Sequence, residues 1–294
     1  MQIDRVAMIG AGSWGTALAL VLARKNIQVA LWDRDADHIA NLARDRENKR
    51  HQPDHPFPES LQVTGDLAEA VTGANCVVMV VPSHGYREVF RQLLPQLADG
   101  TLVVSAVKGI EVDSGMTMTE IMAAENRGGK PLHFCVLSGP SFAAEVADCQ
   151  PTAVTAACVD AQAAETVQQL FAAEYFRVYA ASDVKGLEIS SALKNVIAIG
   201  AGICDGLGYG LNTRAALITR GLAEITRMGV ALGAQPQTFA GLGGLGDLVL
   251  TCTGDLSRNR TVGLKLGSGL TLEEVLAQMT MVAEGVKTTR SCYH

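Results

Sequence analysis

The sequence predicts an α/β protein in which a parallel sheet covered by helices is followed by an all-helical domain. Short, fully apolar runs alternate with helical segments through the first 181 residues, and such runs become rare afterwards. The length of 294 residues suggests two domains at roughly 150 residues each. We place the boundary near Ala181–Val184, which divides the chain into residues 1–181 and 182–294.

The first elements fit a strand–helix–strand unit. Arg5–Ile9 is a short apolar run that predicts a buried strand, Thr16–Ala23 predicts a helix, and Gln28–Trp32 predicts a second strand. All three fit within about 30 residues, the size of a βαβ unit. The turn between the first strand and the helix is Gly10–Gly15, GAGSWG.

The same alternation continues, with one interruption. Asp35–Arg46 predicts a polar helix, and the proline-rich segment Arg44–Ser60 predicts an exposed loop. Three more apolar runs predict strands: Asn75–Val81, Thr101–Val104 and His133–Leu137. Four segments of the second part predict helices: Val184–Ile203, Thr213–Leu232, Leu242–Thr251 and Thr271–Met279.

Composition narrows the class of function. Hydrophobic residues make up 48 % of the chain and charged residues 18 %, which favours a packed core. A net charge of −6 without a basic stripe disfavours nucleic acid and anionic membranes as partners. Seven cysteines without a C-x-x-C pair indicate a reducing compartment and give no reason to expect a metal site. We therefore expect a soluble cytoplasmic protein, with no signal peptide and no membrane insertion.

The glycine-rich turn predicts a dinucleotide site. Gly10 permits the tight turn, Gly12 lets the backbone approach a pyrophosphate, and Gly15 allows close packing of helix and strand. The free N–H groups at the helix start would hold the anion. Because the motif lies between a strand and a helix, we prefer a Rossmann-type dinucleotide-binding domain over an ordinary glycine turn.

The end of the second strand leaves the choice of cofactor open. Asp33 lies where an acid holds the ribose hydroxyls of NAD, and the next residue, Arg34, would meet the 2′-phosphate of NADP. The alternative for either residue is a solvated loop charge. The sequence therefore predicts NAD or NADP as the cofactor.

Two further strand ends are candidate ligand-binding positions, because ligands bind at the carboxyl edge of a parallel sheet. Lys108 follows the run Thr101–Val104 and is as compatible with a surface loop as with a place beside the nicotinamide. Ser138–Ala143, SGPSFA, would allow close backbone approach to a ligand. From the residues alone we interpret it as a simple strand-to-helix turn.

A lysine in an apolar helix is the most unusual feature of the second part. Lys194 and Asn195 lie in the middle of Glu188–Ile203, where nearly every residue after Ser191 is apolar or small. Burial, or a second cation such as Lys108, would lower the lysine pKa toward that of a general base. The alternative is a helix with one wet stripe.

Two more segments carry candidate residues. Gly241–Thr253, GLGGLGDLVLTCT, contains an isolated acid, Asp247, with Thr251 one turn later; Asp247 fits the N-cap of a helix. Ser257–Arg260, SRNR, is a compact group of donors in which Arg258 would grip phosphate oxygens, with hydrogen bonds from Ser257 and Asn259. The alternative for this group is a polar loop.

Several blocks in order resemble one family. They are Gly10–Ala19, Val107–Glu111 (VKGIE), Leu137–Ala147 (LSGPSFAAEVA), Ala192–Leu207 (ALKNVIAIGAGICDGL), Asn212–Ala234, Phe239–Thr253, Ser257–Arg260 and Val282–Thr288 (VAEGVKT). Together they resemble the NAD(P)-dependent sn-glycerol-3-phosphate dehydrogenases, over residues 6 to 288. The resemblance implies an all-helical substrate domain packed on the Rossmann domain, and a homodimer.

The resemblance also implies roles for individual residues. Lys194 matches the catalytic base. Around the reacting carbon it places Lys108, Asn195, Asp247 and Thr251. At the substrate phosphate it places Arg258 and Asn259, with Gly139, Ser141 and Ser257 beside them. Besides the three glycines and Asp33, the cofactor contacts are Ser13, Trp14, Arg34, Lys108, Ala143, Arg258, Val282 and Glu284.

The chain departs from the family at two places. Asp33 stands where several relatives carry a neutral residue before the arginine, which leaves preference for NADP open. The chain ends at Tyr293-His294, so we expect it to lack the last helices that relatives carry.

The implied reaction interconverts glycerol 3-phosphate and dihydroxyacetone phosphate and would supply glycerol 3-phosphate for phospholipid synthesis. Lys194 would take the C2 hydroxyl proton as hydride leaves to NAD(P)+, and Lys108 would stabilise the alkoxide. One alternative is a β-hydroxyacid dehydrogenase or ketopantoate reductase, which would not need SRNR. A non-catalytic NAD(P) sensor is another, but it would not need Lys194.

Overall fold

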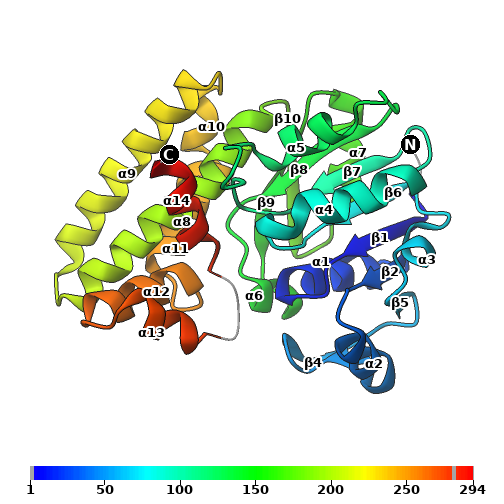
Figure 1. Cartoon of the computed structure of the whole chain (residues 1–294), viewed down its shortest axis with the longest axis horizontal. Helices are drawn as coiled ribbons and strands as arrows, with labels where there is room; N and C mark the ends of the chain where they lie inside the picture. The colour runs from blue at the N-terminus through cyan, green and yellow to red at the C-terminus, as the bar shows by residue number, and fades with distance from the viewer. Residues whose placement is uncertain (1–2, 280–282, 294) are drawn as a thin grey trace.

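Residues 3–279 and 283–293 are described by the computed structural model, which has a sheet domain beside a helical domain (Figure 1). The main sheet has eight strands in the order β10-β9-β8-β7-β6-β1-β2-β5. Its strands are β1 Arg5–Ile9, β2 Gln28–Trp32, β5 Leu61–Thr64, β6 Cys76–Met79, β7 Leu102–Ser105, β8 His133–Ser138, β9 Thr152–Cys158 and β10 Phe176–Ala181. The central strands are fully buried, as their continuous apolar runs predict.

One strand departs from the predicted parallel arrangement. β9 runs antiparallel to β8, with Cys135 opposite Cys158, whereas every other neighbouring pair in this sheet is parallel. Between β8 and β9 lies only α6 (Ala143–Ala147), a helix of five residues. Such a short helix cannot carry the chain back along the sheet, which a parallel connection requires.

Helices cover both faces of the sheet and form a three-layer arrangement. Side chains of α1 and α7 pack on one face, and those of α3, α4 and α5 pack on the other. The helices of this domain are α1 Ser13–Ala23, α2 Ala36–Asp45, α3 Leu67–Val71, α4 Ser83–Leu93, α5 Met118–Glu125, α6, α7 Ala161–Phe171 and the short 3₁₀ helix Leu94–Gln96. Each face therefore has its own apolar core.

The segment predicted as an exposed loop is instead a hairpin with a buried side, so that prediction is wrong. Asn48 and Gln52 are fully buried. The Asn48 amide donates to the Ala11 carbonyl at 2.9 Å, and the Gln52 amide donates to the Ala143 carbonyl at 2.7 Å. These bonds allow polar side chains to be buried without loss of hydrogen bonding. The two strands of the hairpin are β3 Glu47–Asn48 and β4 Gln52–Pro56.

The second domain consists of helices gathered around α8. Its elements are α8 Val184–Gly206, α9 Leu211–Ala231, α10 Pro236–Ala240, a π-helical turn Leu242–Gly246, α11 Asp247–Thr253, α12 Arg258–Gly267, α13 Leu272–Ala277 and α14 Glu284–Tyr293. By length and composition α8 could cross a membrane, but most of its apolar window is buried within the protein. α8 is therefore accounted for as the core helix of this domain.

Glycines bring α8 and α12 unusually close together. A Cβ on Gly202 would lie 2.0 Å from the Arg260 carbonyl oxygen, and one on Gly263 would lie 2.0 Å from the Ile199 carbonyl oxygen. Side chains at these positions would collide with backbone, so only glycine permits this distance between the helices. The close packing sets the start of α12 beside the middle of α8.

Candidate functional site

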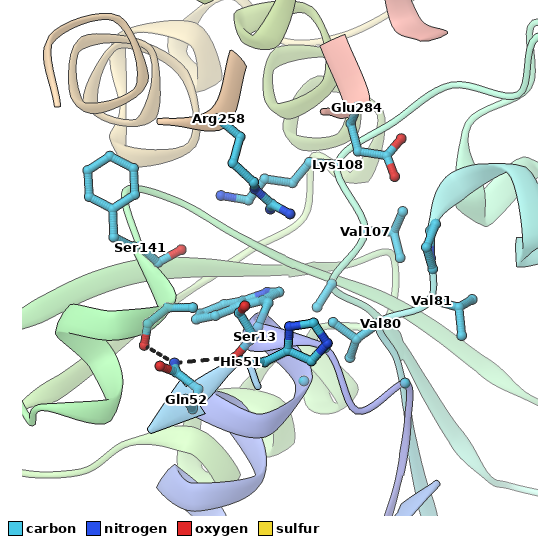
Figure 2. Close-up of a pocket in the computed structure, with 18 of the residues that line it drawn as sticks. Ser13, His51, Gln52, Val80, Val81, Val107, Lys108, Ser141, Arg258 and Glu284 are labelled. Atoms are coloured by element: carbon cyan, nitrogen blue, oxygen red, sulfur yellow. Dashed lines mark hydrogen bonds between the residues drawn. The ribbon is translucent and has the colours of Figure 1, made fainter. Parts of the chain in front are cut away.

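A cleft of about 630 Å³ lies between the two domains (Figure 2). The sheet domain contributes the ends of β1, β6 and β7, and the helical domain contributes α8, α11, α12 and α14. The predicted site residues that line it are Gly10, Gly12, Ser13, Trp14, Gly15, Asp33, Arg34, Lys108, Ser141, Ala143, Lys194, Asn195, Asp247, Thr251, Ser257, Arg258, Asn259 and Glu284. Gly139 is adjacent to the cleft, and Val282 lies outside the described residues.

The glycine-rich loop has the shape that a dinucleotide requires. Gly10 has a φ of +119°, and a Cβ on Gly15 would lie 1.9 Å from the Gly10 carbonyl oxygen, so both positions need glycine. A Cβ on Gly12 would meet no atom of the described residues within 4 Å. Gly12 is the N-cap of α1 and has no side chain with which to cap the helix. The loop therefore leaves open space beside a helix N-terminus, where a pyrophosphate would bind.

Two buried ring nitrogens beside this loop have no partner among the described residues. They are Nε1 of Trp14 and Nδ1 of His51, and both residues line the cleft. Buried polar atoms normally have a hydrogen-bond partner. The loop, its open space and these two nitrogens fit a bound dinucleotide.

Asp33 and Arg34 have different surroundings. The Asp33 carboxylate accepts the N–H of Ala11 at 2.9 Å and the N–H of Asp35 at 3.1 Å, so both oxygens hold backbone of the cofactor loop and the start of α2. Arg34 lines the same end of the cleft and makes no hydrogen bond or ion pair within residues 3–279 and 283–293. Of these two charged residues, Arg34 is therefore the one whose side chain has no protein partner among the described residues.

Lys194, Asp247 and Lys108 form a buried cluster at the centre of the cleft. Asp247 is 1 % exposed and Lys194 is 4 % exposed. One Asp247 oxygen accepts a short hydrogen bond from Nζ of Lys194, and the other accepts Nζ of Lys108 at 2.8 Å. Nζ of Lys194 also donates to Oγ1 of Thr251 at 2.7 Å. A single carboxylate therefore orients two amines from different domains.

The electrostatics of this cluster favour a neutral Lys194. The pKa of Lys194 is lowered to about 7: burial is the main cause, Asp247 opposes the shift, and the ammonium of Lys108 contributes to it. A lysine with a pKa near 7 exchanges a proton readily at neutral pH. The expected properties of a general base are thus present at this position.

The structure excludes two alternatives that the sequence left open for these residues. Glu188, Ser191, Lys194 and Asn195 are all buried, which excludes a wet stripe on α8. Asp247 is the first residue of α11 rather than its N-cap, which is Gly246, and its carboxylate makes no capping bond. The two lysine amines attract the carboxylate away from the helix start.

The strand end at Gly139 holds Lys108 in place. Nζ of Lys108 donates to the Gly139 carbonyl at 2.9 Å, and Oγ of Ser141 donates to the same oxygen at 2.9 Å.

The backbone at Gly139 also requires glycine. Gly139 has a φ of +154°, and a Cβ there would lie 2.8 Å from Cα of Val154 in β9. The residues alone predict only a simple strand-to-helix turn here, and they do not reveal this close approach of two backbones.

The SRNR residues lie at the start of a helix rather than in a loop. Ser257 is the N-cap of α12, and its Oγ accepts the N–H of Arg260. The Arg258 side chain projects into the cleft and makes no hydrogen bond or ion pair with any described residue (Figure 2). The Asn259 amide donates to Oδ1 of Asn195 at 2.9 Å and accepts the N–H of Gly285 at 2.9 Å. Arg258 is the group here that is available to an anion.

Glu284 connects the two domains at the far side of the cleft. Its carboxylate accepts the N–H of Ser83 at 3.2 Å and the hydroxyl of Ser83 at 2.5 Å. Ser83 begins α4 in the sheet domain, whereas Glu284 begins α14. The contact therefore joins the two domains at the wall of the cleft, which Glu284 lines.

Several lining residues were not anticipated from the sequence. Arg50, His51 and Gln52 enter the cleft from the β3–β4 hairpin, and Gln52 bridges the carbonyls of Ser13 and Ala143 (Figure 2). The proline-rich segment predicts an exposed loop, so no signal in the sequence singles these residues out. They stand directly before Pro53, and a local pattern of polar residues does not distinguish buried from solvated amides.

The fold and the cleft define a class: a nicotinamide-dinucleotide-dependent oxidoreductase with a helical substrate domain. Two family models match the chain, the NAD-dependent glycerol-3-phosphate dehydrogenase N-terminus over residues 5–164 and the C-terminus over residues 183–294. The chain belongs to this family. The predictions of family, fold class, enzyme class and NAD(P) as cofactor are confirmed at this level.

Individual relatives agree with the family assignment. The chain is 57 % identical over 291 residues to a glycerol-3-phosphate dehydrogenase [NAD(P)+] of Desulfotalea psychrophila, covering 98 % of this chain and 86 % of the relative. It is 56 % identical over 290 residues to that of Geobacter metallireducens, covering 99 % and 87 %. A crystal structure of glycerol-3-phosphate dehydrogenase from Coxiella burnetii superposes with a TM-score of 0.95 at 40 % identity, covering 99 % of this chain and 88 % of that one.

Proposed function

We propose that the chain interconverts sn-glycerol 3-phosphate and dihydroxyacetone phosphate with NAD(P), and thereby supplies glycerol 3-phosphate for phospholipid synthesis. The observation that carries the proposal is the buried Lys194–Asp247–Lys108 cluster, facing the glycine-rich loop across one cleft. A proton acceptor with a pKa near 7 beside a dinucleotide site suits the oxidation of a secondary alcohol.

Lys194 acts as the general base in this proposal. In its neutral form, Nζ takes the proton of the C2 hydroxyl, and in the reverse direction the ammonium returns that proton to the oxygen. Asp247 and Thr251 hold the amine in position through the hydrogen bonds described above. When bound, the nicotinamide supplies or accepts the hydride.

Lys108 supplies the charge that stabilises developing oxyanion character at C2. Its ammonium is held on Asp247 and Gly139 and does not need to reorganise. With Lys194 neutral, Lys108 and Asp247 cancel each other's charge, so removal of the hydroxyl proton leaves a local excess of positive charge on the two amines. That excess favours the alkoxide-like state.

Arg258 is proposed to hold the substrate phosphate. Its guanidinium has no described protein partner, and it lies beside the start of α12, where Ser257 and Asn259 fix the backbone. Gly139 and Ser141 shape the neighbouring wall. The alternatives that act on a carboxylate, a β-hydroxyacid dehydrogenase or a ketopantoate reductase, would not require the whole SRNR group.

The cofactor is proposed to lie along the glycine loop, between that loop and Glu284. The residues that would hold it are Gly10, Gly12, Ser13, Trp14, Gly15, Asp33, Arg34, Lys108, Ala143, Arg258 and Glu284. Because Asp33 is occupied by backbone N–H groups whereas Arg34 is not, we propose that a 2′-phosphate is accepted and that NADPH is used at least as well as NADH.

The remaining expectations are proposals of organisation. We propose that the domains divide at residues 181 and 182, between the end of β10 and the start of α8. We propose a cytoplasmic homodimer, which is supported by exposed apolar side chains on the outer part of α9, such as Met228 and Val230. Sedimentation of the purified chain as a monomer at micromolar concentration would exclude the dimer.

One assay tests the proposed activity. Absorbance of the reduced nicotinamide is followed with dihydroxyacetone phosphate, once with NADH and once with NADPH, and the same assay is repeated with 3-oxo acids. We expect oxidation of both cofactors with the phosphate substrate only. Turnover of the carboxylate substrates alone would favour the alternative dehydrogenases, and no turnover at all would favour a sensor.

A further inference from the structure

A buried carboxylate outside the reacting cluster joins α8 to the segment that carries Lys108. We propose that Glu188 is a positioning residue for the reaction: it fixes the far end of the Lys108 loop, residues 106–117, against the helix that carries Lys194. This inference rests on the proposed roles of Lys108 and Lys194. Glu188 does not line the cleft, so it acts only through other residues.

The contact is specific and lies between the domains. Glu188 is 3 % exposed on α8. One of its oxygens accepts the N–H of Thr119 at 2.8 Å, and the other accepts the Thr119 hydroxyl at 2.5 Å. Thr119 is the second residue of α5, so its N–H is one of those left without a partner inside the helix. Both carboxylate oxygens are thus used by one residue of the sheet domain.

The Lys108 loop is held at both ends by the same face of α8. Glu188 and Asn195 are seven residues apart, which is close to two full helical turns and places them on one face. The Asn195 amide donates to the Lys108 carbonyl at 3.3 Å, near the beginning of the loop. Glu188 holds Thr119, directly after the loop ends. The two tethers therefore fix the loop relative to Lys194, which lies on the same helix.

The start of α5 uses two carboxylates for different donors. The Glu120 carboxylate accepts the N–H of Thr117 at 2.9 Å, whereas Glu188 accepts the N–H and the hydroxyl of Thr119. Burial raises the pKa of Glu188, which shows that the site disfavours the charged form. An apolar side chain would avoid that penalty but would leave the N–H and the hydroxyl of Thr119 without this acceptor. What only Glu188 provides is a pair of directed hydrogen bonds across the domain boundary.

Three variants test the proposal against a matched control. Glu188→Leu removes both bonds and keeps an apolar filling, whereas Glu188→Gln is neutral and can keep both. Thr119→Val removes only the bond from the hydroxyl. The control is Glu120→Gln, which weakens the ion pair of Glu120 with Lys185, a half-exposed contact between the same two helices. For each variant, kcat, the KM values for dihydroxyacetone phosphate and cofactor, and the melting temperature are measured.

A misplacement of about 1 Å at a reacting group can cost about 10²-fold in rate. We therefore expect kcat to fall by about 10-fold or more in Glu188→Leu, with the cofactor KM within about threefold of wild type. Glu188→Gln should retain kcat within about threefold, and Glu120→Gln should resemble wild type. Thr119→Val should lower kcat by an intermediate factor, and it decides the question if Glu188→Leu does not fold.

Two outcomes would overturn the inference. One is a folded Glu188→Leu or Thr119→Val protein with wild-type kcat. The other is a loss of activity in Glu188→Leu that matches the fraction of unfolded protein, with kcat per folded molecule unchanged. A wild-type rate in Lys194→Ala would instead contradict the proposed function, so the two failures can be distinguished.

Discussion

At the scale of single residues, the chemistry depends on the proton of Lys194. The first prediction is that Lys194→Ala loses turnover while the cofactor still binds. Nζ is the only group in the described part of the cleft with a pKa lowered to about 7 by burial together with a neighbouring ammonium. General acid–base catalysis typically contributes about 10²–10⁴-fold, so we expect a loss in kcat of that size. Steady-state rates and fluorescence titration with NADPH measure the two properties separately.

The second prediction concerns pH and follows from the same pKa. Oxidation of glycerol 3-phosphate needs the neutral amine, so its rate should rise as pH increases through about 7. Reduction of dihydroxyacetone phosphate needs the ammonium, so its rate should fall over the same range. Rate profiles in both directions, measured at constant ionic strength, check this. Parallel profiles in the two directions would argue against Lys194 as the titrating group.

A variant of Lys108 tests the cause of the low pKa. The ammonium of Lys108 lowers the pKa of Lys194, and it also shares the Asp247 carboxylate. Lys108→Met removes both effects, so the midpoint of the profile should move to higher pH, in addition to any loss of rate. Lys49→Met, which removes an exposed cation on the hairpin, should leave the midpoint unchanged.

At the scale of elements, the glycine contacts between α8 and α12 are the most restrictive packing in the helical domain. Gly202→Ala should destabilise the protein by about 1–3 kcal/mol, because its Cβ would collide with the Arg260 carbonyl. Displacement of α12 should also raise the KM for the phosphate substrate, since Arg258 begins that helix. Urea unfolding and steady-state kinetics measure the two effects.

Gly200→Ala is the matched control two residues earlier. A Cβ at Gly200 would meet only Cδ2 of Leu217 at 3.5 Å, an ordinary contact. Replacing a helical glycine without a clash should stabilise the helix by up to about 1 kcal/mol. Equal destabilisation by both variants would show that the close approach of the two helices is not what these glycines provide.

Elements whose residues interact locally were predictable from the sequence, and those fixed by distant partners were not. The strand Cys76–Met79 and the core helix α8 follow from runs of apolar residues alone. The hairpin around Gln52 was missed because its amide bonds carbonyls 39 and 91 residues away in the chain. The residues around Asp247 alone suggest a helix cap, and only the family resemblance places it at the reacting carbon, because its partners Lys108 and Lys194 are equally remote in the chain.

At the scale of the whole molecule, two domains meet at one cleft, and neither domain alone contains all the residues that line it. The sheet domain provides the glycine loop and Lys108, whereas the helical domain provides Lys194, Asp247 and Arg258. Some contacts between the domains line the cleft, such as Asp247 with Lys108 and Glu284 with Ser83, and others lie away from it, such as Glu188 with Thr119. A ligand in the cleft therefore contacts both domains at once and should stabilise the fold as a unit.

The last prediction uses Gly12 to separate binding from folding. Its φ is −74°, and a Cβ there would meet none of the described atoms within 4 Å, so Gly12→Val should fold with a melting temperature near that of wild type. The new side chain would occupy the space assigned to the pyrophosphate. A ligand at 100 times its Kd stabilises a protein by about 2.7 kcal/mol, so NADPH at that concentration should raise the melting temperature of the wild type. This increase should disappear in Gly12→Val. Gly15→Ala, whose Cβ would collide with the Gly10 carbonyl, should instead unfold at lower temperature even without cofactor. A full NADPH-dependent shift in Gly12→Val would place the cofactor elsewhere, since no dinucleotide held against this loop could coexist with a valine at its centre.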